Sequence, residues 1–350
     1  MSFDPNAAAA VDSGVFGLLC SEKESTLVYI PVPWEATTSY GGGTANGPRA
    51  ILEASHQVDL FDYEVFRPYE PGLYMLEESS EIRQWNEEAK AHARLVIEAA
   101  GNIDDNPELR AALHRVNALG ERLNDSVRET TQGLLAQGKI AAVVGGDHST
   151  PFGALQAVAE RYPSFGVLHF DAHSDTRQAF EGFVWSHASI FHNVLERIPQ
   201  VTQLVQVGIR DFCEEEWEYC RSQGKRVKVF FDADLSQSGF DGTPWTKSVD
   251  YMISSLPKDV WVSFDIDGLD PRFCPHTGTP VPGGLDFNQA IFVISSLVRS
   301  GRRIIGFDLN EVAPDPRGES EWDANVGARL LYKLSAWTLV SQGKVKLHKR

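Results

Sequence analysis

The chain has 350 residues, with 32 Lys and Arg against 48 Asp and Glu, which gives a formal net charge of −16 at pH 7. Its hydrophobic content of 42% and charged content of 23% exclude a disordered chain and allow two domains or one large α/β domain. No apolar run reaches the roughly 18 residues of a membrane span. The acidic balance argues against a nucleic-acid partner and suits a small cationic one, although acidic surfaces also serve solubility alone.

The cysteines and the N-terminal residues favour a cytoplasmic protein. Residues 1–17 lack the basic and apolar segments of a signal peptide. The cysteines form no C-x-x-C pair and are too sparse for a disulfide framework, so we expect free thiols with packing roles and no zinc site. They are Cys20, Cys213, Cys220 and Cys274.

Short apolar runs alternate with helical patterns along most of the chain. These runs are continuously apolar, which is typical of strands buried on both faces. The predicted strands are Leu27–Ile30, Ile140–Val144, Phe165–Phe170, Leu204–Val207, Arg226–Phe231, Val260–Phe264 and Ile304–Phe307. The alternation predicts an α/β fold with a parallel sheet covered by helices on both faces.

Capping residues place helices between these strands. The Ser-Thr-Pro sequence at 149–151 supplies an N-cap and a first-turn proline for a helix that stops before Pro163. Another helix begins after Asp286 and ends at Gly301, a suitable C′ glycine. The apolar face of a last helix consists of Leu330, Leu331, Leu334 and Trp337.

One long segment, residues 81–138, contains helical patterns only. Its apolar residues recur at spacings near three and four, and residues 101–107 form a polar break. We predict a helical hairpin inserted into the sheet domain or packed beside it, acting as scaffold or, alternatively, as a lid or an oligomer contact. In this interpretation residues 1–25 are an N-terminal extension and residues 26–350 form a single domain.

Polar clusters follow directly after four of the predicted strands. The carboxyl ends of the strands in an open parallel sheet line one crevice, where ligands bind. We therefore expect the clusters to converge on one site. They are Gly145-Gly146-Asp147-His148-Ser149, Asp171-Ala172-His173-Ser174-Asp175, Asp265-Ile266-Asp267-Gly268-Leu269-Asp270-Pro271 and Asp308-Leu309-Asn310-Glu311.

The residue types in these clusters point to divalent metal ions. Asp171, His173 and Asp175 alternate at a strand end, so their side chains can face the same way, and Asp265 and Asp267 repeat this spacing. Several carboxylates in one crevice repel one another unless cations compensate them. Imidazoles with carboxylates suit Mn²⁺, Fe²⁺, Co²⁺, Ni²⁺ or Zn²⁺, whereas the lack of thiolates disfavours structural zinc.

His148 is a further candidate in the same crevice. It follows two glycines, which let the backbone come close to its neighbours, and it lies at the start of a predicted helix. We interpret the adjacent Asp147 as a helix cap or a hydrogen-bond partner of a ligand, not as a ligand itself.

Three of these motifs together resemble the ureohydrolase family of arginases, agmatinases and formiminoglutamases. They are Gly-Gly-Asp-His-Ser, Phe-Asp-Ala-His-Ser-Asp and Ser-Phe-Asp-Ile-Asp-Gly-Leu-Asp-Pro, and the resemblance spans about residues 29–337. The glycine-rich turn at 41–51 is also similar. The resemblance implies a three-layer α/β/α fold with an eight-stranded parallel sheet, a homo-oligomer (trimer or hexamer), and two divalent ions per subunit, Mn²⁺ or Ni²⁺.

The resemblance also assigns roles to individual residues. One ion would be held by His148, Asp171, Asp175 and Asp265. The other would be held by Asp171, His173, Asp265 and Asp267, so that Asp171 and Asp265 bridge the pair.

Two further positions resemble catalytic residues of the family. Glu311 would grip the substrate guanidinium through two parallel charge-assisted hydrogen bonds, and His187 would shuttle protons. The implied reaction is hydrolysis of a guanidino C–N bond with release of urea. Two divalent ions lower the pKa of a shared water molecule, and Asp175 or His187 would protonate the leaving nitrogen.

The substrate is less well defined by the sequence. Phe180, Phe183 and Trp185 either shorten the pocket or pack elsewhere, and Arg177 either meets a substrate carboxylate or faces solvent. The Ser-Gly-Asn-type element of arginases is absent, and Ala188 stands where agmatinases often have glycine. We favour guanidine or a short guanidino compound, followed by agmatine, and then by guanidino acids, arginine and formiminoglutamate.

Two other classes of protein remain as alternatives. A metal-dependent deacetylase would use one zinc ion, whereas the presence of His148, Asp175 and Asp267 together favours two ions. A catalytically silent subunit would be expected to lack ligands, and none is missing here.

Overall fold

The computed structural model describes residues 4–10 and 13–349. Its strands are β1 (Leu27–Val32), β2 (Val65–Phe66), β3 (Leu73–Met75), β4 (Ile140–Gly145), β5 (Phe165–Phe170), β6 (Val201–Ile209), β7 (Val227–Phe231), β8 (Asp259–Asp265), β9 (Arg303–Asn310) and β10 (Lys346–Leu347). Eight of them form one sheet in the order β3-β1-β4-β9-β8-β5-β6-β7, with every neighbouring pair parallel. β2 and β10 form a separate antiparallel pair.

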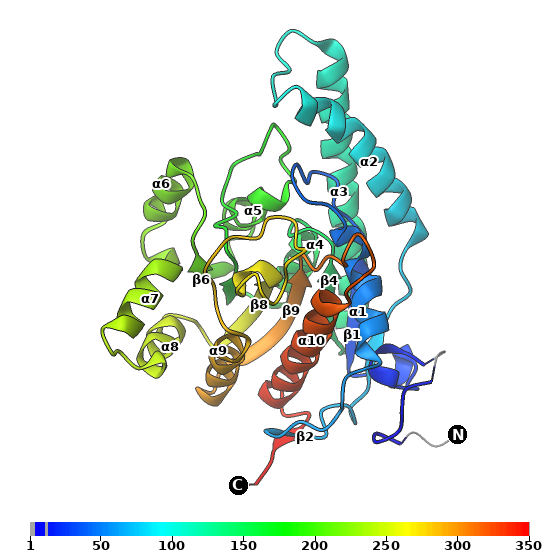
Figure 1. Ribbon diagram of the computed structural model, residues 1–350, viewed down its shortest axis with the longest axis vertical. Coiled ribbons are helices and arrows are strands. Elements are labelled where there is room, and N and C mark those ends of the chain that lie inside the picture. Colours follow the sequence, from blue (N-terminus) through cyan, green and yellow to red (C-terminus); the bar gives the residue numbers. More distant parts are fainter. Residues whose placement is uncertain (1–3, 11–12, 350) are drawn as a thin grey trace.

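Helices cover both faces of this sheet (Figure 1). One face packs against α1 (Gly47–Ser55), α8 (Trp245–Ser254), α9 (Phe287–Arg299) and α10 (Trp322–Ser341). The other packs against α3 (Pro107–Ala136), α4 (Phe152–Arg161) and α5 (Ile190–Arg197). The remaining helices are α2 (Ser80–Glu98), α6 (Glu214–Ser222) and α7 (Asp232–Phe240). The predicted three-layer α/β/α fold is therefore confirmed.

Alternate residues of each strand enter opposite layers of the core. On β4, Ala142 and Val144 pack with α1 and α10, whereas Ala141 and Val143 pack with α3 and α4. Both sets are buried, which explains why the strands are apolar at consecutive positions. The polar residues that follow the strands are therefore held by a rigid, fully covered sheet.

The structure differs from the sequence-based expectations at two places. The edge strand β3 has only three residues, too few to give a periodic signal, and it was not among the predicted strands. The helix expected to begin with an N-cap at Ser149 or Thr150 begins instead at Phe152, with Pro151 at the cap position and no side-chain cap. The preceding residues form a turn held by Asp147, whose Oδ1 accepts hydrogen bonds from the Ser149 amide (3.0 Å) and hydroxyl (2.5 Å).

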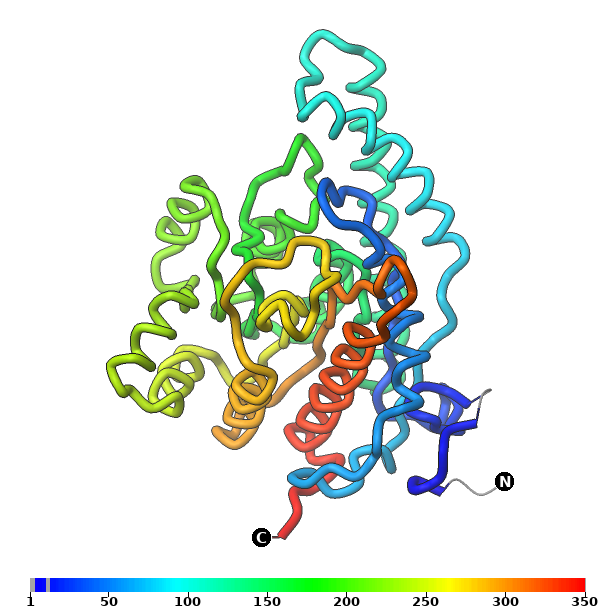
Figure 2. Tube along the Cα trace, viewed as in Figure 1, coloured from blue at the N-terminus to red at the C-terminus, as the bar shows by residue number. Residues whose placement is uncertain are grey.

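The predicted helical hairpin consists of α2 and α3, the cyan elements that project beyond the sheet in Figures 1 and 2. Ser79 caps α2 by accepting a hydrogen bond from the Ile82 amide, and Asn106 caps α3 through the amides of Glu108 and Leu109. Pro107 occupies the first turn of α3, where its missing N–H is tolerated.

Within the described ranges, no helix is long and apolar enough to cross a membrane. All four cysteines are free thiols, as expected, and Cys220 and Cys274 are buried.

Gly306 on β9 provides a test of sheet packing. A Cβ there would lie 2.4 Å from Cζ3 of the buried Trp261 and 2.9 Å from the Ala141 carbonyl oxygen. We predict that Gly306→Ala lowers the free energy of unfolding by about 1–3 kcal/mol through overpacking, measured by urea denaturation. The control is Gly239→Ala in α7, where no atom lies within 4 Å and alanine favours the helix. Equal effects of the two substitutions would contradict this prediction.

Candidate active site

The four polar clusters lie at the carboxyl ends of four adjacent strands. β4, β9, β8 and β5 are consecutive in the sheet, and they are followed or terminated by the segments carrying His148, Glu311, Asp265 and Asp171, respectively. All four side chains are buried. The parallel topology thus brings together residues that are far apart in the sequence, as predicted.

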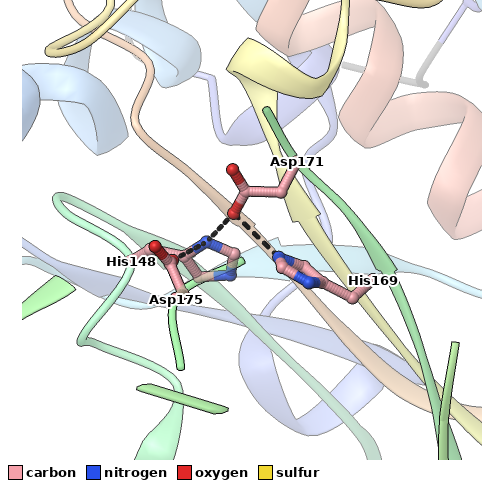
Figure 3. Close-up of side chains that lie close together, drawn as sticks. All are labelled: His148, His169, Asp171 and Asp175. Atoms are coloured by element: carbon pink, nitrogen blue, oxygen red, sulfur yellow. Dashed lines mark hydrogen bonds and ion pairs between the residues drawn. The ribbon is translucent and has the colours of Figure 1, made fainter. Parts of the chain in front are cut away.

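Nδ1 of His148 faces three carboxylates. It lies 3.0 Å from Asp171 Oδ2, 3.2 Å from Asp265 Oδ2 and 3.4 Å from Asp175 Oδ2. Figure 3 shows His148 and Asp175 on one side of the Asp171 carboxylate. These four residues are the set that the family resemblance assigns to the first ion.

The tautomer of His148 follows from its other ring nitrogen. Asp308 only accepts hydrogen bonds, so the Ser263 hydroxyl donates to its Oδ1 at 2.7 Å. The Ser263 oxygen then accepts from Nε2–H of His148 at 2.9 Å, so that Nδ1, which faces the three carboxylates, is the nitrogen that can give up its proton and bind a metal ion. This is the orientation of a metal-ligating histidine supported by a hydrogen-bonded partner.

A second group of donors shares Asp171 with the first. His173 Nδ1 lies 3.4 Å from Asp171 Oδ1 and 3.1 Å from Asp267 Oδ2. The Ala172 amide donates to the other Asp267 oxygen at 3.0 Å, and the Asp267 amide donates to Asp265 Oδ1 at 2.8 Å. Asp171, His173 and Asp267 each offer a ligand atom within 4.8 Å of the others. A bridging role for Asp171 fits this geometry, whereas Asp265 contacts the first group directly and the second through Asp267.

Charges in this cluster favour bound cations. Burial and the neighbouring carboxylates raise the pKa values of Asp175 and Asp265 well above the usual range. Burial opposes protonation of His148, yet the surrounding aspartates raise its pKa. Asp267 Oδ2 is buried and faces Nδ1 of His173 at 3.1 Å without a well-aligned hydrogen bond. A lone pair and several carboxylate oxygens directed at common points are the chemistry of a site for divalent ions, so the residues fit such metals.

His169 was not among the predicted site residues, although it lies in this cluster. Its Nε2 is 2.8 Å from Asp171 Oδ2, as Figure 3 shows. Gln206 Nε2 donates to the Ser174 carbonyl at 2.7 Å and to His169 Nδ1 at 3.1 Å, and the carbonyl fixes the orientation of this amide. His169 Nδ1 is therefore the acceptor and Nε2–H the donor to Asp171. We conclude that His169 orients the shared carboxylate and is not itself a ligand.

Asp175 and Glu311 both adopt left-handed backbone conformations, with φ of 54° and 62°. Such conformations are uncommon outside glycine and, where maintained, cluster at functional sites. In Asp175 the carbonyl accepts the Phe191 amide at 2.9 Å, and in Glu311 the amide donates to the Gly146 carbonyl at 2.7 Å. These bonds fix the backbone so that both carboxylates lie at the site.

Glu311 lies next to the aspartate cluster. Its Oε1 accepts a hydrogen bond from the His148 amide at 3.0 Å. Burial, together with Asp265 and Asp147, raises its pKa well above the usual range, so a cationic group beside it would stabilise the ionised form.

The glycines before His148 allow the close backbone approach that the sequence predicts. A Cβ on Gly146 would lie 1.9 Å from the Trp34 carbonyl oxygen, so only glycine fits at this position.

His187 lies at the half-buried side of the site. Its Nδ1 is 3.5 Å from the hydroxyls of Thr37 and Ser186, and the Phe180 ring lies 6.4 Å away. Burial lowers the pKa of His187 to about 4, so the imidazole is neutral at neutral pH and can accept a proton. His173 is also partly exposed, with 23% of its side chain accessible, so solvent reaches the site from this side.

The bulky residues after Asp175 have separate roles. Phe183 is fully buried in a small core with Ala93 and Val96 of α2 and residues of α3. The Trp185 ring packs against Phe152 at 4.9 Å and under Arg197. These two residues are therefore packing residues, the alternative left open by the sequence, and only Phe180 stays beside His187.

Comparison with known proteins places this geometry in a family. A family model described as "Arginase family" matches residues 25–336. The chain belongs to the arginase family. It is 31% identical over 312 residues to N(1)-aminopropylagmatine ureohydrolase of Thermus thermophilus (89% of each chain) and 30% identical to proclavaminate amidinohydrolase of Streptomyces clavuligerus (88% of this chain, 87% of the other). The solved structure of the Streptomyces enzyme has a TM-score of 0.73 at 24% identity and covers 95% of this chain and 99% of its own.

The arginase-family chain is thus a ureohydrolase, a hydrolase acting on guanidino C–N bonds. Sequence reasoning identified the aspartates and histidines of the strand ends but missed the supporting residues His169, Gln206 and Ser263. A histidine two residues before Asp171 on an otherwise apolar strand was the available signal for His169, since alternate strand residues share a face.

The hydrogen bond from His169 to Asp171 leads to a prediction about metal binding. We expect His169→Leu to weaken Mn²⁺ binding about 10- to 100-fold without changing the number of ions bound, because the carboxylate loses its orienting donor. His169→Gln, which retains a side-chain N–H, should fall between this variant and the wild type. Calorimetric titration measures both quantities, and loss of a whole equivalent of metal would instead make His169 a ligand.

Proposed function

We propose that this chain hydrolyses guanidine or a short guanidino compound to release urea, using two divalent ions, Mn²⁺ or Ni²⁺, at the cluster described above. The observation that carries the proposal is the shared carboxylate of Asp171, which lies within reach of both His148 and His173. Two donor groups meeting at one carboxylate suit a pair of adjacent ions.

Each predicted ligand has a place in this proposal. The first ion would be held by His148, Asp171, Asp175 and Asp265, and the second by Asp171, His173, Asp265 and Asp267. When bound, such a pair supplies a nucleophilic hydroxide near neutral pH and stabilises negative charge that develops during attack.

The remaining steps belong to residues of the chain. Glu311 would orient the planar guanidinium by two parallel hydrogen bonds, and its raised pKa means that binding of this cation and ionisation of the carboxyl favour each other. The leaving nitrogen needs a proton, which Asp175 or His187 would deliver. Asp175 lies in the ligand cluster, 3.4 Å from Nδ1 of His148, whereas the neutral His187 at the half-buried side of the site suits a shuttle to solvent.

The surroundings of Arg177 bear on the substrate. Its Nε lies 3.5 Å from Glu216 Oε2, and its guanidinium lies 5.2 Å from the centre of the Phe180 ring. Because this positive charge is already paired, it gives little support for a carboxylate-bearing substrate. Phe180 beside His187 favours a short substrate. Agmatine is the second candidate, since relatives are named agmatinase and N(1)-aminopropylagmatine ureohydrolase.

We further propose that the protein is a cytoplasmic homo-oligomer, a trimer or a hexamer. The four free thiols suit a reducing compartment, and the family resemblance implies the homo-oligomer. Sedimentation analysis distinguishes the two states, and a monomer at micromolar concentration would contradict the proposal.

A urea-release screen tests the substrate. Protein loaded separately with Mn²⁺ and with Ni²⁺ is assayed on guanidine, agmatine, arginine, guanidinobutyrate and formiminoglutamate. We expect the highest kcat/KM for guanidine. Urea from agmatine alone would select the second candidate, and ammonia or formamide from an amidine without urea from any guanidine would overturn the reaction.

Variants separate metal binding from catalysis. We predict that Asp171→Asn abolishes turnover and binding of both ions, because it removes the shared carboxylate. His187→Asn should lower kcat by about 10²- to 10⁴-fold and leave the metal content unchanged. Elemental analysis and urea release measure the two effects. The exposed Asp250→Asn on α8 serves as the control, and metal loss in the His187 variant would contradict its assigned role.

A further inference from the structure

The α2–α3 hairpin contacts two loops that lie at the active-site edge of the sheet. The Glu35 loop (residues 33–46) follows β1, and the Phe180 loop (residues 176–186) follows Asp175. In Figures 1 and 2 the blue and green loops rise toward the cyan hairpin. Contacts between side chains show that the hairpin fixes both.

The Glu35 loop is attached to α2 through one buried carboxylate. Oε2 of Glu35 accepts hydrogen bonds from the amides of Gly43 (2.7 Å) and Ala45 (2.9 Å), while Oε1 pairs with Lys90 of α2. The Glu35 amide donates to Oδ1 of Asn86, also on α2, at 2.8 Å. Only 5% of the Glu35 side chain is exposed, so the loop closes around a charge whose cationic partner belongs to the hairpin.

The Phe180 loop packs against α3 through Phe183 and is hydrogen-bonded to this helix by the amide side chain of Asn117. Asn117 Oδ1 accepts from the Val184 amide at 2.9 Å, and its Nδ2 donates to the Gly182 carbonyl at 3.2 Å. One turn further along α3, Gly120 leaves room for Trp185, because a Cβ there would lie 2.8 Å from that of Trp185. Both the oxygen and the nitrogen of the Asn117 side-chain amide therefore hydrogen-bond to the backbone of this loop.

Both loops reach residues of the proposed catalytic machinery. Thr37 of the Glu35 loop lies with its hydroxyl 3.5 Å from Nδ1 of His187, and the Phe180 loop ends beside that histidine. The Gly41 amide donates to the Gly278 carbonyl at 3.2 Å, and a Cβ on Gly278 would lie 3.3 Å from Glu311 Oε2. The proposed metal ligands, in contrast, lie at strand ends or within five residues of them, and they make no hydrogen bond to the hairpin among the described residues.

We propose that the α2–α3 hairpin determines substrate specificity, with Lys90 and Asn117 as positioning residues that fix the two loops on either side of His187. This inference rests on the proposed function for its substrate class. Guanidine contacts only the centre of the site, whereas a substrate with a tail must pass between the loops. Loosening the loops therefore changes selection between the two kinds of substrate and leaves metal binding intact.

Hydrogen–deuterium exchange of the metal-loaded, full-length protein tests the positioning directly. Lys90→Met should raise exchange at Gly43 and Ala45 but not at Val184, and Asn117→Leu should do the reverse. Lys90→Arg, which retains a charge, should restore protection. The matched control is Arg115→Met, which breaks the pair between Arg115 and Glu88 within the hairpin (2.6 Å) and touches neither loop.

Kinetics test the consequence for specificity. In the Lys90→Met and Asn117→Leu variants, the ratio of kcat/KM for guanidine to that for agmatine should fall about fivefold, the effect of losing roughly one hydrogen bond. The Arg115→Met control should keep the wild-type ratio. Metal content should stay at the wild-type level in all of them.

The outcomes separate the inference from the proposed function. Unchanged exchange in either loop, or an unchanged substrate ratio despite faster exchange, overturns the role of the hairpin. Failure of the wild type to release urea overturns the proposed function instead. In that case the ratio of dissociation constants for guanidine and agmatine, measured by calorimetry, replaces the kinetic ratio, and an unchanged value again overturns the inference.

Discussion

Mutual repulsion among carboxylates is the constraint around which this molecule is organised. Asp171, Asp175, Asp265 and Asp267 lie together at the ends of buried strands, where water cannot screen their charges. Such a cluster is stable only when cations or protons balance it, and the raised pKa values of Asp175 and Asp265 express this requirement. The rigid sheet opposes separation of these groups, so their charge is available for binding metal.

A set of buried hydrogen bonds orients the histidines of this charged centre. Asp308 and Ser263 fix the tautomer of His148, and Gln206 fixes that of His169. In both cases a group with only one possible hydrogen-bond direction determines which imidazole nitrogen carries the proton. The arrangement holds Nδ1 of His148 toward the aspartates, where it can exchange a proton for a metal ion without turning the ring.

Sequence reasoning found the parts of the molecule that have a strong periodic or compositional signal. Continuous apolar runs identified seven strands of the main sheet, and spaced Asp and His residues at their ends identified the cluster. The three-residue strand β3 lacked such a signal, and the eight-stranded count came from the family resemblance. The roles of the aromatic side chains after Asp175 could not be assigned either. A phenylalanine that packs in the core, such as Phe183, looks the same in the sequence as one that contacts the substrate. Only the position of the hairpin distinguishes them.

Strand ends and loops carry different functions at this site, and this separation affects which parts of the protein can change in evolution. The proposed metal ligands lie at the ends of sheet strands or within five residues of them, whereas His187, Phe180 and Thr37 belong to segments that the sheet does not pair. Substitutions or length changes in those segments leave the metal-holding scaffold in place. New preferences for small nitrogenous compounds can thus arise during evolution by remodelling the periphery, without rebuilding the chemistry at the centre.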